Sequence, residues 1–226
     1  MKLKYQLMLL VSLIVFTFST VWIVLEAQSI RDYYLLQKEL VETVRVQQGH
    51  AMGAGVIVSR RGHILSCAHI FGHYKPQVHK EPFTNITVTF YDKTEVGATL
   101  VRLDPQRDLA LLYLDRGYGG FKYAIIAKVD ATLGNFVRVI GHPYDLDWTV
   151  TEGKVSGTNR KVENEIITQT NAVINPGNSG GPVFDSSGRV VGLAESLFPY
   201  PMFTGQGFFI PSSRIRKFLK ETEVNQ

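Results

Sequence analysis

The sequence has only one cysteine, and this scarcity excludes one class of fold. Because Cys67 stands alone among 226 residues, the chain cannot form an internal disulfide. A small scaffold held by a disulfide framework is therefore excluded, and the fold depends on its core. With 45% hydrophobic residues, a chain of this length can build that core in one domain, or in one domain of two halves.

The sequence also lacks the blocks of lysine and arginine, interleaved with aromatic residues, that are typical of nucleic-acid-binding proteins. Its formal net charge of +4 is spread thinly along the chain. We therefore expect no nucleic-acid partner. The histidines His63, His69 and His73 form no HExxH-type arrangement, so we expect no catalytic metal and no cofactor.

One long hydrophobic run is present at the N-terminus. Met8 to Leu25 is an 18-residue stretch without a charge, preceded by Lys2 and Lys4, and it is just long enough to span a bilayer. A cleavable signal peptide is the alternative, but its apolar region is usually about 7 to 15 residues and ends at small residues. We favour an uncleaved membrane anchor over residues 1–28, with a cytoplasmic N-terminus and the rest of the chain on the extracytoplasmic side, periplasmic or at the cell surface.

The next segment, residues 29–48, is predicted to be a juxtamembrane helix or linker. From Ile30 to Val44 the apolar residues recur roughly at helical spacing. The segment could serve self-association, lie on a membrane surface, or act as a spacer packed on the domain.

From residue 49 the pattern changes to short β-type runs broken by turns. About twelve such runs at spacings near ten residues indicate an all-β sandwich or barrel. They include GVIVS, NITVTFY, LALLYL, YAIIA, FVRVIG, EIITQT and RVVGLAES. The tail from Pro211 to Glu223 is predicted to be a helix. Its expected N-cap is Ser212 or Ser213, and its expected buried residues are Ile215, Phe218 and Leu219.

The glycine-rich stretch INPGNSGGPVF places Ser179 on a tight turn. A serine hydroxyl becomes a strong nucleophile when an imidazole takes its proton and a carboxylate orients that imidazole. His69 follows a predicted strand in GHILSCAHIF, and Asp108 precedes another in DPQRDLALLYL. Each residue alone would more often be structural, but together they fit a catalytic triad.

Four segments in order strengthen this interpretation: GAGVIVSRRGHILSCAH, DPQRDLALL, VIGHPYDLDWTVTEGKVSG and TNAVINPGNSGGPVF. Over nearly all of residues 50–216 the chain resembles the HtrA (Deg-type) branch of the trypsin-like serine proteases. The resemblance implies two six-stranded antiparallel barrels with the active site between them, in a domain spanning residues 49–226. It assigns His69 as general base and then acid, Asp108 as its orienting partner, and Ser179 as nucleophile.

The resemblance also gives the glycines a role. It places the oxyanion hole at Gly177, Asn178 and Ser179, with the N–H groups of Gly177 and Ser179 directed at the developing negative charge. Gly177 must then adopt a backbone conformation that few residues tolerate. Asn178 stands where digestive enzymes carry an Asp that pairs with a new N-terminus, so we expect no activation through that salt bridge.

Substrate preference follows from the same alignment of motifs. Val173, six residues before the nucleophile, is expected at the floor of the pocket for the residue preceding the cut, and it cannot pair with Lys or Arg. We therefore predict cleavage after small or medium aliphatic residues. An extended peptide is expected to add as a strand along residues 192–198. The contacts assigned to that segment are Leu193, Ala194, Glu195 and Ser196.

Several features depart from the family or extend it. Asn171 replaces a common Asp, which leaves open how the substrate-pocket loop is held. FPYPMFTGQG after Leu197 is expected to line a pocket, although a membrane-proximal surface or ordinary packing fits it equally. Only residues 221–226 follow the terminal helix, so we expect no PDZ domain. Homotrimers are common in the family and are an expected assembly.

Together these features predict a membrane-anchored serine endopeptidase that acts on unfolded or exposed protein segments. The alternative is a tethered peptide-binding or chaperone-like module with a latent protease site.

Overall fold

The computed structural model describes residues 2–72, 85–115, 119–162, 165–196 and 206–224. It divides into two compact units, Met1–Lys38 and Glu39–Gln226. The N-terminal unit lies within helix α1 (Lys2–Glu42), which continues without a break through the position where the sequence predicted the anchor to end. Among the described residues, Leu13–Glu42 of α1 is long and apolar enough to cross a membrane, by length and composition alone.

The barrel domain begins earlier than the sequence indicated. Residues 29–48 were expected to form a helix or linker, but the helix ends at Glu42 and β1 (Thr43–Gln48) follows at once. β1 is antiparallel to β2 and β4. Val44 and Val46 are fully buried in the barrel, so TVRVQQ has the alternating pattern of a half-buried strand.

The first barrel is closed in the order β1-β2-β3-β6-β5-β4. Its remaining strands are β2 (Ala51–Ile57), β3 (His63–Ser66), β4 (Ile86–Thr89), β5 (Glu95–Asp104) and β6 (Leu109–Leu114). A short 3-10 helix, η1 (Ala68–Phe71), follows β3. Closure leaves this sheet without a free edge. Leu65, Leu111 and Leu112 are fully buried on its two faces.

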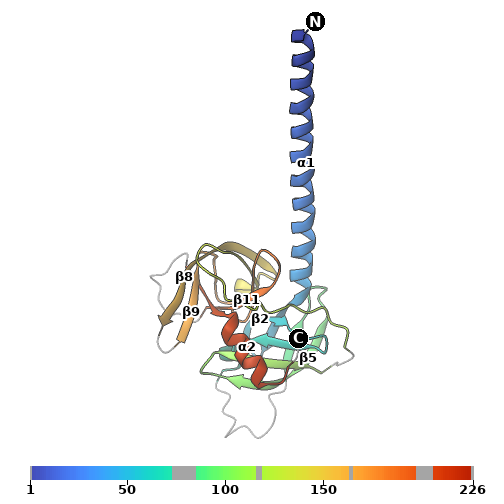
Figure 1. The fold of residues 1–226 in the computed structure, drawn as a ribbon. Coiled ribbons are helices and arrows are strands. Elements are labelled where there is room, and N and C mark those ends of the chain that lie inside the picture. Colours follow the sequence, from blue (N-terminus) through green and yellow to red (C-terminus); the bar gives the residue numbers. More distant parts are fainter. Residues whose placement is uncertain (1, 73–84, 116–118, 163–164, 197–205, 225–226) are drawn as a thin grey trace. The chain divides into compact units, whose positions relative to one another are not determined.

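The second barrel is closed in the order β10-β11-β12-β9-β8-β7. Its elements are β7 (Phe136–Gly141), η2 (Pro143–Asp145), β8 (Thr149–Val162), β9 (Glu165–Thr170), β10 (Pro182–Phe184), β11 (Val190–Glu195) and β12 (Gly207–Pro211). Figure 1 shows β8 and β9 side by side. The predicted trypsin-like double barrel is confirmed, although the run YAIIA is not a strand: Ile126 makes only an isolated bridge to Val190.

Helix α2 (Ser212–Glu221) ends the described fold and packs against β11 and β12 (Figure 1). The predicted buried face is confirmed, since Ile215, Phe218 and Leu219 are all buried. The predicted N-cap is wrong, because Pro211 occupies that position. The Ser212 hydroxyl instead donates to Asp130, which lies on a separate loop.

Candidate active site

The pairing of β3 with β6 brings His69 and Asp108 together. Ser66 pairs with Ala110 in this antiparallel ladder, so the residues just after β3 face those just before β6. The His69 Nδ1 lies 2.7 Å from Asp108 Oδ2, and the His69 backbone N–H donates to Asp108 Oδ1 at 2.8 Å. Asp108 adopts a left-handed backbone conformation, with φ of 51°.

This geometry sets the tautomer of His69. A carboxylate only accepts hydrogen bonds, so the Nδ1 atom must carry the proton that it shares with Asp108. The Nε2 atom of a neutral ring is then left as the base. The pair has the arrangement needed to accept a proton from a serine and to stabilise the resulting imidazolium.

Ser179 lies in the loop between β9 and β10, and this loop packs against the first barrel. The Ser179 carbonyl accepts a hydrogen bond from the Ala54 N–H at 2.8 Å. A Cβ at Gly180 would lie 2.4 Å from the Ala54 carbonyl oxygen and 2.8 Å from the Cys67 nitrogen. Only glycine permits this approach, which brings the loop against the segment that carries His69.

The Ser179 hydroxyl is hydrogen-bonded to Ser196. The two Oγ atoms are 2.5 Å apart, and the Ser196 N–H donates to Ser179 Oγ at 3.2 Å. No hydrogen bond joins Ser179 to His69 in the described part of the chain. A change in the Ser179 side-chain rotamer would be needed to bring its hydroxyl to the imidazole.

The backbone of the 177–181 turn has two N–H groups without an acceptor. The other three are occupied, and these are Asn178 (to Asn175, 2.9 Å), Gly180 (to Ala194, 2.9 Å) and Gly181 (to Asn178, 2.9 Å). Within the described residues, only the N–H groups of Gly177 and Ser179 remain unpaired in this turn. Asn178 was expected to contribute to the oxyanion hole, but its N–H is used inside the turn and is not an available donor.

The turn that follows β7 holds Gly177 in place. The Tyr144 N–H donates to the Pro176 carbonyl and the His142 N–H donates to the Gly177 carbonyl, both at 3.2 Å. The N–H of a trans peptide points away from its C=O, so the Gly177 N–H is directed away from Tyr144. Gly177 has a φ of +100°, and a Cβ there would lie 2.2 Å from the His142 carbonyl oxygen. Both facts favour glycine at this position.

The residues assigned to substrate binding differ in their exposure and in whether their backbone groups are already hydrogen-bonded. Val173 is 45% exposed, and its carbonyl accepts a hydrogen bond from the Thr151 hydroxyl. Leu193 and Ala194 are fully buried in β11, where both backbone groups of Ala194 bond to Gly180 and Gly181. A peptide strand cannot pair with Ala194 on that side. Strand addition along residues 192–198 stays a prediction.

Asn171 does not leave its loop loosely held. Its side-chain oxygen accepts a hydrogen bond from the Lys154 N–H at 2.6 Å, and its own N–H donates to the Lys154 carbonyl at 3.2 Å. The amide thus ties the start of the nucleophile loop to β8. The predicted pocket-lining segment after Leu197 lies largely outside the described residues.

Cys67 contributes a third potential ligand beside the His–Asp pair. Among the described residues, Cys67, His69 and Asp108 offer ligand atoms within 4.8 Å of one another. Burial raises the pKa of the Cys67 thiol well above its usual range, and the negative charge of Asp108 adds to this. Metal binding needs the thiolate, and His69 Nδ1 is already bound to Asp108. This donor set therefore fits a metal poorly.

His142 is a buried residue of the site region that sequence reasoning missed. It is fully buried next to Gly141, and burial is the main cause that lowers its pKa to about 4. The ring is therefore neutral at pH 7, and its Nδ1 accepts the Trp148 N–H at 3.2 Å. A histidine between glycine and proline gives no periodic signal of burial, so only the turn geometry reveals its role.

Two closed barrels, a His–Asp pair and a serine on a glycine-rich turn define the class of trypsin-like peptidase folds. A model of the trypsin-like peptidase domain matches residues 53–193, and the chain belongs to this family.

Comparisons with individual proteins point to the HtrA/DegP branch. The chain is 32% identical to Protease Do-like 1, chloroplastic, of Arabidopsis thaliana over 180 residues, covering 76% of this chain and 38% of that protein. It is 35% identical to a probable periplasmic serine endoprotease, DegP-like, of Pseudomonas fluorescens over 171 residues, covering 74% and 34%.

A solved structure agrees with these sequence relatives. The serine endoprotease from Yersinia pestis matches with a TM-score of 0.69 and 29% identity, over 83% of this chain and 64% of that one. The chain thus spans a little over a third of the length of these two curated relatives.

Proposed function

We propose that the protein is a membrane-anchored serine endopeptidase in which Ser179, His69 and Asp108 act as the triad. One observation supports this most directly: among the described residues, the N–H groups of Gly177 and Ser179 are the two in the 177–181 turn that lack an acceptor. Two such donors match the requirement of an oxyanion hole.

The reaction follows from the positions of these groups. Ser179 Oγ turns from Ser196 to His69 Nε2 and attacks the scissile carbonyl, and its proton passes to His69. Asp108 stabilises the imidazolium, and the two free N–H groups bind the oxyanion. Collapse of the tetrahedral intermediate breaks the peptide bond, and His69 gives its proton to the leaving amine. A water molecule then hydrolyses the acyl-enzyme by the same steps and restores Ser179.

The contact between Ser179 and Ser196 supports a resting state that substrate must change. Glu195 and Ser196 belong to the segment along which we expect an extended peptide to pair, and the Ser196 N–H donates to the nucleophile. A substrate carbonyl that accepts this N–H would release Ser179 Oγ. Binding of the peptide and activation of the serine would then occur together.

We propose unfolded or exposed polypeptide segments as substrates, cleaved after small or medium aliphatic residues. An extended chain is needed for strand addition at the end of β11. The half-exposed valine at position 173 supports an apolar preference, because it offers no charge to pair with Lys or Arg. Cleavage of a peptide panel after Arg in preference to Val or Leu would contradict this preference.

We further propose that α1 anchors the protein, with its N-terminal lysines in the cytoplasm and the barrels on the extracytoplasmic side. The length and hydropathy of α1 support spanning. The Pseudomonas fluorescens relative is named as a probable periplasmic protein. Resistance of membrane-bound protein to alkaline extraction, with protease access to the barrels only from outside, is the expected result. The homotrimer stays a prediction, to be tested by light scattering of the detergent-solubilised protein.

Labelling with a fluorophosphonate tests the activity itself. We expect covalent labelling of the full chain that is abolished in Ser179→Ala and strongly reduced in His69→Ala. Ser187→Ala is a matched control, because this exposed serine lies in the turn after β10. Absence of labelling with and without unfolded substrate would favour the alternative, a tethered peptide-binding module with a latent site.

A further inference from the structure

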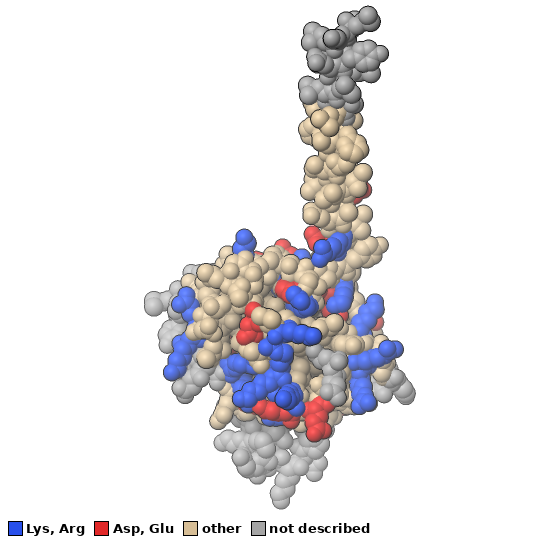
Figure 2. Space-filling model, viewed as in Figure 1, with Lys and Arg blue, Asp and Glu red and all other residues tan. Residues whose placement is uncertain are grey.

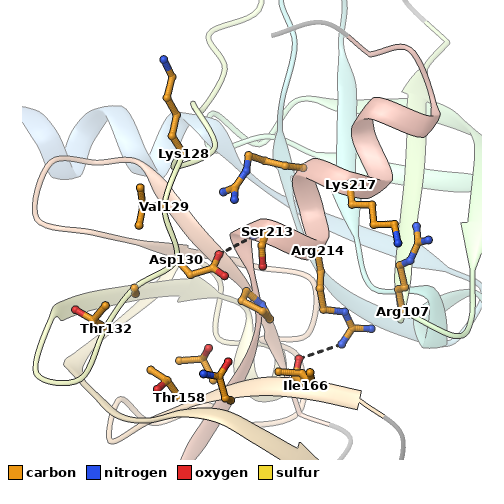
Figure 3. Close-up of a pocket in the computed structure, with 15 residues that line it drawn as sticks. Arg107, Lys128, Val129, Asp130, Thr132, Thr158, Ile166, Ser213, Arg214 and Lys217 are labelled. Atoms are coloured by element: carbon orange, nitrogen blue, oxygen red, sulfur yellow. Dashed lines mark hydrogen bonds between the residues drawn. The ribbon is translucent and has the colours of Figure 1, made fainter.

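A cavity of about 810 Å³ lies away from the triad. It is lined by the start of α2, the 128–132 loop, the β8–β9 hairpin and Arg107 (Figure 3). None of His69, Asp108 and Ser179 lines it. The volume falls within the range of small-molecule sites, which is about 300 to 1,000 Å³.

The lining of this cavity, which we call the basic pocket, is strongly positive. Five cationic side chains and a single acid, Asp130, line it. The cations are Arg107, Lys128, Arg214, Arg216 and Lys217. The whole chain has a formal net charge of only +4, from 24 basic and 20 acidic residues. Figure 2 shows Lys and Arg side chains gathered on the face that carries α2.

Three cations of the basic pocket differ from two arginines elsewhere that pair with carboxylates. Arg138 pairs with Glu39, and Arg189 pairs with Asp185. Within the residues that the structure describes, none of Lys128, Arg216 and Lys217 forms a salt bridge with a carboxylate. These three cations come from two separate segments of the chain, so their convergence is a product of the fold.

The remaining two cations, Arg107 and Arg214, are held by partners within the protein. Arg107 pairs with Glu221 at 2.8 Å and with Asp104 at 3.3 Å. Arg214 donates to the carbonyl of Ile166 at 3.2 Å (Figure 3). Both contacts fix a guanidinium at the rim of the pocket.

Asp130 is engaged mainly at the start of α2. Its Oδ1 accepts hydrogen bonds from the Ser212 hydroxyl and the Ser213 N–H, each at 2.7 Å, and Figure 3 shows the bond to Ser213. Burial opposes its ionisation, but these hydrogen bonds and the nearby charge of Arg216 outweigh burial and lower its pKa. The carboxylate therefore acts as a cap for the helix.

Like charges gathered in a concave surface repel one another and focus a positive potential. An anion that fills the concavity removes this repulsion. A guanidinium fork matches the geometry of phosphate oxygens, and lysines add point charges. Neutral donors complete the lining: Thr132, Thr158 and Asn159. A single carboxylate would neutralise only one of Lys128, Arg216 and Lys217.

We propose that the basic pocket binds a ligand that carries more than one phosphate group. The ligand is either a soluble oligophosphate or the phosphorylated headgroup of a membrane lipid, since both present the same chemistry. Binding requires none of the triad residues. The Ser179→Ala variant must therefore bind as well as the wild type, which separates this proposal from the proposed peptidase activity.

Isothermal titration of the full chain in neutral detergent with tripolyphosphate tests the site. The double variant Lys128→Gln/Lys217→Gln removes two exposed amines of the pocket. We expect its affinity to fall by about tenfold or more. The matched control, Lys122→Gln/Lys154→Gln, removes two exposed lysines outside the lining and changes the net charge equally. It is expected to bind within about twofold of the wild type.

Three outcomes would overturn the proposal: no measurable binding, equal loss of affinity in the pocket and control variants, or citrate binding as tightly as tripolyphosphate. The source of the ligand is distinguished in nanodiscs of phosphatidylcholine, with or without an equal amount of phosphatidylglycerol. If the ligand is a lipid headgroup, the anionic discs compete with tripolyphosphate. Its binding is then weaker in these discs for the wild type but not for the pocket variant. Unchanged binding identifies a soluble ligand.

Discussion

The direction of the Ser179 hydroxyl depends on its two hydrogen bonds to Ser196. One of them joins the two hydroxyls, and the other comes from the Ser196 backbone N–H. Because the hydroxyl of Ser196 contributes only the first, its removal weakens the resting contact without changing the backbone. A net hydrogen bond of this kind contributes about 0.5 to 1.5 kcal/mol.

We predict that Ser196→Ala increases the rate at which Ser179 is acylated. The resting rotamer loses one of its two contacts, so a larger fraction of molecules presents the hydroxyl to His69. The second-order rate of fluorophosphonate labelling is expected to rise by about two- to tenfold. Ser187→Ala is the control and should label at the wild-type rate. Slower labelling of Ser196→Ala would show that the Ser196 hydroxyl helps the reaction.

Gly177 provides a second prediction, with a control already present in the chain. A Cβ at Gly177 would lie 2.2 Å from the His142 carbonyl oxygen, whereas Gly134, also at positive φ, has nothing within 4 Å. Gly177→Ala must displace the peptide that carries one oxyanion donor, so the labelling rate should fall by about 100-fold or more. Gly134→Ala carries only backbone strain and should label normally. Equal labelling of both variants would refute the role of Gly177.

Local sequence motifs were enough to predict roles for several residues of the candidate site. The direct contact of His69 with Asp108 and the positive φ of Gly177 agree with the roles that these motifs imply. The use of the Asn178 N–H was not predictable, because it depends on how the turn closes on itself. The contact between Ser179 and Ser196 depends on a rotamer, which the sequence does not encode locally.

The number of strands agrees with the prediction, but two segments differ from their predicted secondary structure. TVRVQQ falls within residues 29–48, which the sequence predicts as a juxtamembrane helix or linker because the apolar residues recur roughly at helical spacing as far as Val44. Its strand identity comes from antiparallel pairing with β2, a long-range contact. YAIIA has the composition of a strand, but only Ile126 reaches a partner. Tertiary contacts overrode local preference in both segments.

Strand β7 connects the first residues of the barrel domain to the active-site turn. Near its start, Arg138 contacts the fully buried Glu39 at 2.8 Å and also Glu152 at 2.7 Å. At its end, a Cβ on Gly141 would lie 2.6 Å from Asn178 Oδ1. The buried pair at Glu39 therefore fixes one end of a strand whose other end supports the nucleophile turn.

We predict that Arg138→Met strongly destabilises the barrel domain. Removing one partner leaves the carboxylate of Glu39 buried without its cation, which costs about 3 to 5 kcal/mol. Urea unfolding followed by tryptophan fluorescence measures this loss. The double variant Glu39→Gln/Arg138→Met should recover a large part of it. Arg189→Met, which breaks a more exposed pair with Asp185, should cost less than about 1 kcal/mol. Equal losses for the two arginines would contradict the prediction.

Across the whole barrel domain, the turn between β7 and β8 joins the two barrels. The Trp148 indole N–H donates to the Thr43 carbonyl of β1 at 3.3 Å. Asp147 pairs with Arg45 at 3.3 Å and with Lys93 at 3.0 Å, and both of these cations belong to the first barrel. The same turn holds the carbonyl of Gly177 through His142. The contact between the barrels and the shape of the oxyanion turn are thus supported by one segment.

The protonation of His142 should make the stability of this assembly depend on pH. Burial lowers the pKa of His142 to about 4 in the folded state, against 6.5 for a free histidine. The charges nearest to it are Asp147, which favours the protonated ring, and Arg45, which opposes it. Between these two pKa values the unfolded chain binds more protons than the folded one. The contribution of His142 to the free energy of unfolding is therefore constant above pH 6.5 and is lost as the pH falls toward 4.

We expect the free energy of unfolding of the wild type to decrease by up to about 1.4 kcal/mol per pH unit over that interval from this residue alone. His142→Asn has no proton to gain there, so its stability should change less steeply with pH, whatever its absolute value. His50→Asn, at an exposed position, should keep the wild-type slope. Urea unfolding at intervals from pH 7 to about 4.5 measures the slope. Parallel curves for the wild type and His142→Asn would show that the buried ring does not control acid stability.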